Sequence, residues 1–238
     1  MVREIVHHTL PKEEGINLYV SADEESLARE HFDPERFQIA EWSMEDGTVV
    51  FSEDLAEDRA NLLLYGLPEF PDDLIEGLVN GFRRSAFEMG RIATHVHCGW
   101  CANSEEARGW YEAAIHFSDL VLLDNRQEVA DPWVRDYQEK FRKQRYPCLF
   151  DLVRKGLPKH PDWIFDSQPR RLSLVFDPDD LSGFADSEYG FDDDEEDLEE
   201  EEEAAGDPYL RRNVAGEREK SVRSLPFALD ETSETTAD

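Results

Sequence analysis

Short apolar runs, separated by amphipathic stretches, fill the first three quarters of the chain. Runs that are rich in β-branched and aromatic residues and bounded by turn residues favour strands. The run at 120–124, LVLLD, has no alternation of apolar and polar residues, which is typical of a strand covered on both faces. Strands are therefore predicted at 16–20, 37–42, 48–51, 61–66, 91–98, 120–124, 147–153 and 171–177.

Helix-start signals stand between several of these runs. Pro71 is followed by two aspartates, and both proline and acidic residues favour the first turn of a helix. Asn103 or Ser104 can cap a helix whose first turn contains two glutamates, and Asp131-Pro132 opens another. The alternation of strands and helices predicts an α/β fold, with a mainly parallel sheet and helices on both of its faces.

The composition changes sharply after the last predicted strand. Residues 1–177 are predicted to form one α/β domain, and 178–206 an acidic, disordered linker. Within that linker, 192–203 is acidic at eleven of twelve positions, and such mutual repulsion opposes folding. Residues 207–238 form a short tail, whose segment 207–229 regains basic and apolar residues. We interpret this segment either as a tethered peptide that docks on the domain or a partner, or as a free tail.

The net charge restricts the kinds of partner that the protein is expected to bind, and the cysteine content indicates the cellular compartment. The formal net charge of −31 would repel phosphate backbones and anionic membrane surfaces, so neither nucleic acid nor a membrane is an expected partner. No run approaches the ~20 apolar residues of a membrane span. Three cysteines cannot form a disulfide framework, and their number fits a reducing compartment. With no signal-like segment at the start, a soluble cytoplasmic protein with a protein partner is expected.

One stretch, RIATHVHCGWCANSEE, concentrates metal-ligand residue types within seven positions. Histidine nitrogen and cysteine sulfur both bind zinc, and the two cysteines have the spacing of a zinc knuckle. The alternative is a strand end whose cysteines pack in the core, since successive strand residues point to opposite faces. A third reading, a redox pair at a helix start, needs the first cysteine exposed. The candidate zinc ligands are His95, His97, Cys98 and Cys101.

The segment 118–128, SDLVLLDNRQE, resembles an element of the CobW-type metallochaperone GTPases, which belong to the P-loop NTPases. In that family an Ala-Asp pair precedes an apolar strand, and Asn-Lys-x-Asp follows it to bind the guanine base. Here Ser118-Asp119 precedes the strand and Asn125-Arg126-Gln127-Glu128 follows it.

Two earlier runs stand in the order of that family's preceding strands. One ends at Gly66, with prolines nearby, and the other ends at Cys98, where the family has an aspartate. The resemblance spans roughly residues 58–155 and implies a P-loop-NTPase-like sheet with its ligand site at the carboxyl ends of the strands. The residues that it places in a nucleotide-like pocket are Gly66, Asn125, Arg126 and Glu128.

The chain departs from the family pattern at the phosphate-binding, metal-binding and base-binding motifs. The chain has no G-x-x-x-x-G-K-[ST] motif, so it lacks the backbone nest, lysine and hydroxyl that hold nucleotide phosphates and Mg²⁺. The family's Cys-x-Cys-Cys metal motif is also missing. Arg126 stands in place of lysine and Glu128 in place of aspartate, which alters the shape of the pocket. The resemblance therefore implies a degenerate scaffold.

These observations favour binding over catalysis. No G-x-S-x-G elbow or other catalytic constellation stands out, so an enzyme is not expected. The sequence predicts a non-catalytic binding protein on a CobW-like, GTPase-like scaffold that lacks the phosphate-binding loop. Two alternatives remain open: a metal-handling protein that uses the cluster at 95–101, and an acidic protein-interaction module.

Overall fold

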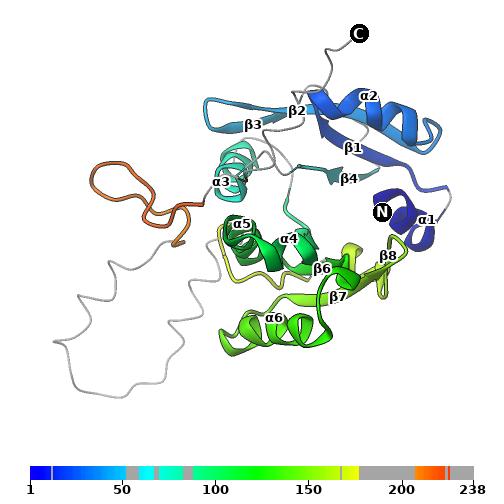
Figure 1. The fold of residues 1–238 in the computed structure, drawn as a ribbon. Coiled ribbons are helices and arrows are strands. Elements are labelled where there is room, and N and C mark those ends of the chain that lie inside the picture. Colours follow the sequence, from blue (N-terminus) through cyan, green and yellow to red (C-terminus); the bar gives the residue numbers. More distant parts are fainter. Residues whose placement is uncertain are drawn as a thin grey trace, which may run out of the picture. The chain divides into compact units, whose positions relative to one another are not determined.

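The structure, a computed structural model, describes residues 1–11, 13–51, 59–66, 70–82, 88–166, 168–176, 207–222 and 225 (Figure 1). The chain divides into two compact units, one made of 1–172 with 222–238 and the other of 173–221. The first unit is a mixed α/β fold with two mainly parallel sheets, which confirms the predicted fold class at that level. The predicted acidic linker, 178–206, lies outside the described residues.

The first sheet has the strand order β3-β2-β1-β4. The central strand β1 pairs in parallel with β2 and β4, and β3 returns antiparallel to β2 through a turn in which Asp46 and Gly47 have positive φ. The strands are β1 (Ile16–Ser21), β2 (Phe37–Glu45), β3 (Thr48–Phe51) and β4 (Ala60–Leu63).

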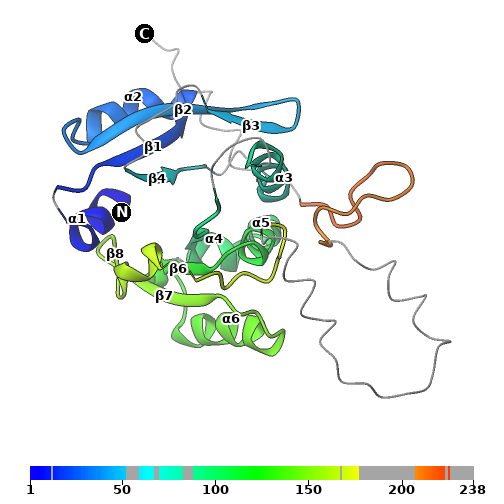
Figure 2. The same ribbon diagram turned by 180° about the vertical axis from the view of Figure 1, so that it is seen from behind.

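Helices cover both faces of this sheet, as Figures 1 and 2 show from opposite sides. Helix α2 (Ala22–His31) packs on the face that carries Leu18 and Ile39. Helix α3 (Pro71–Phe82) packs on the opposite face, against β3, where a Cβ added to Gly81 would lie 2.6 Å from a backbone oxygen. Helix α1 (Val2–Thr9) adds the fully buried Val6 to the same core as Leu18.

The second sheet has the order β5-β6-β7-β8. The first three strands are parallel, and β8 is antiparallel to β7. The strands are β5 (Ala93–His97), β6 (Leu120–Asp124), β7 (Leu149–Arg154) and β8 (Leu157–Pro158), and the helical segments are α4 (Cys98–Asn103), α5 (Glu105–His116), η1 (Arg126–Glu128), α6 (Asp131–Lys143) and η2 (Pro161–Phe165).

Both long helices of this part pack on one face of the second sheet. Val121 and Leu123 of β6 share a buried cluster with residues of α5 and α6, among them Trp110 and Phe141. The alternate residues of β6 point to the other face, where Leu122 packs near η2. Because the strand order rises in one direction and parallel crossovers are right-handed, the two helices must lie on the same side.

Two details of the prediction were wrong. The single sheet is replaced by two, because the chain between β4 and β5 forms α3, which packs on β3, and β5 then starts a new sheet. The strand predicted at 171–177 does not form over its described residues, 171–176. There the chain is fixed by side-chain bonds instead: Arg171 forms a buried ion pair with Asp119.

The second unit is described at 173–176 and 207–221. Its clearest feature is a tight turn between Arg212 and Arg218, which form an antiparallel bridge. The Asn213 side chain accepts hydrogen bonds from the backbone N–H groups of Ala215 and Glu217, at 2.9 and 3.0 Å. These bonds hold a short hairpin-like loop inside the segment that sequence patterning marks as basic and apolar.

Candidate functional site

The carboxyl ends of β5 and β6 bring histidine and acidic side chains together. The strands are adjacent and parallel, and their register pairs His97 with Asp124. His95 Nε2 lies 3.1 Å from Asp124 Oδ2, and the Asn125 N–H donates to Asp124 Oδ1 at 2.7 Å. Partial burial would raise the pKa of Asp124, but the hydrogen bonds from His95 and Asn125 lower it below its ordinary value. Asp124 is therefore a carboxylate at neutral pH.

The amide of Asn125 joins His97 to Glu128. Asn125 has left-handed backbone geometry, with φ of 52°, which asparagine tolerates better than most residues. Its Nδ2 lies 2.7 Å from His97 Nε2 and donates to Glu128 Oε1 at 3.1 Å. The His97 ring stacks on Trp100, with ring centroids 4.3 Å apart. These four side chains thus form one connected group at the edge of the sheet.

Gly99 allows Glu128 to lie close to α4. A Cβ built on Gly99 would stand 2.0 Å from Glu128 Oε2, so any other residue would push this carboxylate away. One Glu128 oxygen is thus bonded to Asn125 and the other lies against Gly99. In this arrangement the carboxylate does not present two free oxygens to a base edge, which bidentate recognition of guanine would require.

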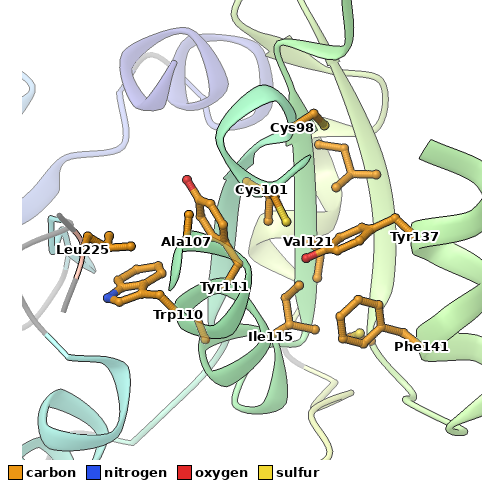
Figure 3. Packing of buried hydrophobic residues seen from close by; sticks show 14 residues of the cluster. Cys98, Cys101, Ala107, Trp110, Tyr111, Ile115, Val121, Tyr137, Phe141 and Leu225 are labelled. Carbon is orange, nitrogen blue, oxygen red and sulfur yellow. The ribbon is translucent and has the colours of Figure 1, made fainter. Parts of the chain in front are cut away.

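Cys98 and Cys101, the cysteines among the predicted zinc ligands, lie in the core. Cys98 and Cys101 are fully buried in the cluster that α5 and α6 form with β6 (Figure 3). Burial raises the pKa of the Cys98 thiol to about 12 and also raises that of Cys101. Tyr137 approaches Cys101 from α6, with its hydroxyl toward the thiol (Figure 3). Both thiols are therefore protonated at neutral pH.

The four predicted zinc ligands are not brought together around one point. His95 contacts Asp124, His97 contacts Asn125, and the thiols of Cys98 and Cys101 are in the apolar core. Within the part of the chain that the structure describes, no group of three or more His, Cys, Asp and Glu side chains is placed to hold a metal ion. The physical reason is that α4 starts at Cys98, directly after β5, and turns its cysteines inward.

We expect all three cysteines to resist modification in the folded protein. The third, Cys148, is also buried and its pKa is raised to about 12. An aromatic disulfide reagent at pH 8 should leave the thiols unmodified over minutes and should label all three in guanidinium. A Leu27→Cys variant is the control, because Leu27 is 56 % exposed and its replacement should react at once. Rapid labelling of Cys98, Cys101 or Cys148 in the folded protein would contradict their burial.

The same burial predicts a loss of stability at high pH. The unfolded thiols ionise near their ordinary pKa of about 8.5, whereas folded Cys98 holds its proton up to about pH 12. Above pH 9 the unfolded state therefore binds fewer protons than the folded state, and the free energy of unfolding falls as pH rises toward 12. Urea unfolding at pH 8 and pH 10.5 measures this as a lower midpoint at the higher pH.

The residues of the predicted nucleotide-like pocket are divided between the two sheets. Asn125, Arg126 and Glu128 share the turn after β6, and Arg126 lies close enough to Cys98 to act on its thiol electrostatically. Gly66 follows β4, the edge strand of the first sheet. The sequence places them at corresponding strand ends, but those strands are not in one sheet.

Asp119 is a buried residue whose role sequence reasoning missed. Its carboxylate is fully buried and accepts hydrogen bonds from the backbone N–H groups of Ile92, at 2.8 Å, and Arg170. It also forms an ion pair with Arg171 at 3.2 Å. It ties the starts of β5 and β6 to the segment near residue 170. The sequence signal is an acidic residue directly before an apolar strand, which also belongs to the pattern of the family resemblance.

A second candidate site is a cavity of about 580 Å³ in the first unit. It runs along β4, the edge strand of the first sheet among the described residues, and over the face of the second sheet opposite α5 and α6. Its lining is mainly apolar and comes from elements that are distant in the sequence. Representative lining residues are Val2, Leu62, Leu78, Leu122 and Ile164.

Comparisons with protein-family models, curated proteins and solved structures found no match to this chain. The resemblance to the CobW-type GTPases therefore rests on the sequence pattern alone. Among the described residues, no helix combines the length and apolar character that crossing a membrane requires.

Proposed function

We propose that the protein is a non-catalytic binding protein that holds a small, largely apolar molecule in the cavity beside β4. The cavity is the observation that carries this proposal. Its volume of about 580 Å³ lies within the ~300–1,000 Å³ range of small-molecule sites, and a lining of aliphatic and aromatic side chains is typical of them. A ligand there would gain the free energy of removing apolar surface from water.

The polar edge of β5 and β6 supports binding rather than chemistry. Its histidines are bonded to Asp124 and Asn125, and its thiols are protonated and buried. A nucleophile needs an exposed, activated group with a base in reach, and the groups gathered at this edge do not offer that arrangement. Asn125, Arg126 and Glu128 are better explained as the turn that holds α4 against the strand ends.

The scaffold itself is proposed to be a degenerate relative of the CobW-type GTPases. The support is the order of Ser118-Asp119, the apolar strand β6 and the Asn125–Glu128 turn. The geometry after β1 supports the loss of the phosphate site: α2 begins at Ala22 directly after Ser21, the last residue of β1. No residues separate the two elements, so they leave no room for a loop of backbone N–H groups that could hold phosphates.

A cavity-filling variant tests the proposed function. Diphenylhexatriene, a neutral apolar fluorophore, is expected to bind saturably to the full-length protein. Leu62→Phe should weaken that binding by about tenfold, because the larger ring takes up cavity space and repacking around it costs free energy. Leu27→Phe, at an exposed position on α2, is the matched control and should bind as the parent chain does.

The measurement is a fluorescence titration of each variant, with thermal unfolding to confirm that each is folded. Equal binding by the Leu62→Phe and Leu27→Phe variants would show that the fluorophore does not use this cavity. No saturable binding by the parent chain would exclude the proposed function.

A further inference from the structure

Arg91 is a buried arginine in the wall of this cavity. Only 4 % of its side chain is exposed, although a guanidinium is charged at every physiological pH. One terminal nitrogen, Nη2, donates to the backbone oxygen of Gln168 at 2.7 Å and lies 3.3 Å from Asp166 Oδ2. These contacts of Nη2 fix the position of the Arg91 side chain, which belongs to a residue that lines the cavity.

The other nitrogens of this guanidinium are not satisfied. Nε and Nη1 of Arg91 are buried and have no hydrogen-bond acceptor among the described residues. Buried N–H groups are almost always paired, because each unpaired one has lost its water without a replacement. A hydrogen-bond acceptor on a ligand would therefore contribute more binding free energy at Arg91 than at an arginine that is exposed to solvent.

We propose that the cavity takes an amphipathic carboxylate, with its apolar chain along β4 and its carboxylate bonded to Arg91. This inference rests on the proposed function and names the class of ligand. A carboxylate is the acceptor whose charge and geometry suit a guanidinium, and charge-assisted hydrogen bonds are stronger than neutral ones. The rest of the cavity wall is mainly apolar and suits an alkyl or aromatic body.

The other ionisable groups of the wall act less directly on the ligand. Glu88 is exposed, so solvent screens its charge. Asp166 is 38 % exposed and lies 3.3 Å from Nη2 of Arg91, so solvent screens part of its charge. His95 is bonded to Asp124. Met1, which carries the α-amino group of the chain, also lines the wall but is 38 % exposed. Arg91 is therefore the most desolvated charge of this wall, and the strongest electrostatic contact should be with an anion.

Calorimetric titration with decanoate and with 1-decanol tests the inference on the full-length protein. The two probes share the alkyl chain and differ in the head group. We expect decanoate to bind about tenfold or more tightly than 1-decanol. Arg91→Gln should abolish that difference by weakening decanoate alone, and Arg91→Lys should restore part of it, because lysine keeps the charge but not the guanidinium geometry.

Arg135→Gln is the matched control. The side chain of Arg135 is 78 % exposed on α6 and pairs with the neighbouring Asp136, so decanoate binding should not change. An equal loss in the Arg91→Gln and Arg135→Gln variants would indicate a general charge effect and overturn the inference.

The remaining outcomes separate the two proposals. If both probes bind equally to the parent chain, the carboxylate inference is wrong while the proposed function stands. If neither binds, the proposed function fails with it. Should Arg91→Gln prevent folding, the ratio of decanoate to 1-decanol affinity in the parent chain and in the Arg91→Lys variant still decides the question.

Discussion

Replacing Asp119 with alanine is expected to lower the free energy of unfolding by about 3–5 kcal/mol, the usual cost of removing one partner of a buried ion pair. The guanidinium of Arg171 would remain buried without its carboxylate, from which it now lies 3.2 Å away. The backbone N–H groups of Ile92 and Arg170 would lose their acceptor at the same time. A loss of this size is a large fraction of the stability of a typical domain.

Urea unfolding measures this effect, and two further variants sharpen it. Asp136→Ala is the control, because 69 % of the Asp136 side chain is exposed, and its stability should stay within about 0.5 kcal/mol of the parent chain. Asp119→Ala combined with Arg171→Met should recover part of the loss, since no uncompensated charge then remains. A cost below about 1 kcal/mol for Asp119→Ala would mean that water reaches the pair.

Local signals in the sequence predicted most elements of the fold. The apolar run at 120–124 coincides with β6, and Pro71 and Asp131 begin α3 and α6 as expected. Ser104 caps α5: its hydroxyl accepts a hydrogen bond from the N–H of Ala107 at 3.0 Å. These features depend on the side chains of a few consecutive residues, so one sequence suffices to find them.

Long-range contacts account for what the sequence did not predict. The division into two sheets depends on where α3 packs, and no local pattern records that choice. The alternating pattern at 171–177 favours a strand, but the ion pair of Arg171 with Asp119 fixes that segment in another conformation. A buried ion pair between residues 52 positions apart leaves no periodic signal.

The sequence likewise predicted one part of the candidate sites and missed the rest. The sequence marked the edge with His95, Cys98 and Asn125, because consecutive polar residues after apolar strands are visible in the chain. It could not show that both thiols turn into the core, since that depends on α4 starting at the strand end. The cavity was not predicted, because its wall combines α1, β4, α3, β5 and η2, and an isolated Arg91 gives no motif.

Replacing Leu225 with aspartate is expected to release the C-terminal segment from the domain. Leu225 is only 3 % exposed and belongs to the buried cluster of Trp110 and Ala107, beside Trp110 in Figure 3. Val222 packs against the same cluster. Of the two interpretations of the 207–229 segment, these contacts agree with docking on the chain's own domain for the part that contains Val222 and Leu225. Burial of a leucine side chain contributes about 1.5–3 kcal/mol.

Proteolysis and unfolding measure that release. The Leu225→Asp variant should be cut near its C-terminus faster than the parent chain, and its free energy of unfolding should fall by up to about 3 kcal/mol, because α5 then exposes Trp110 to water. Val214→Asp is the control, since Val214 is fully exposed. Equal cutting of the two variants would contradict docking. Because the segment belongs to the same chain as the domain, it is present at high effective concentration. A separate peptide with the sequence of 219–229 should therefore compete weakly with the attached segment and bind more tightly once Leu225 is replaced.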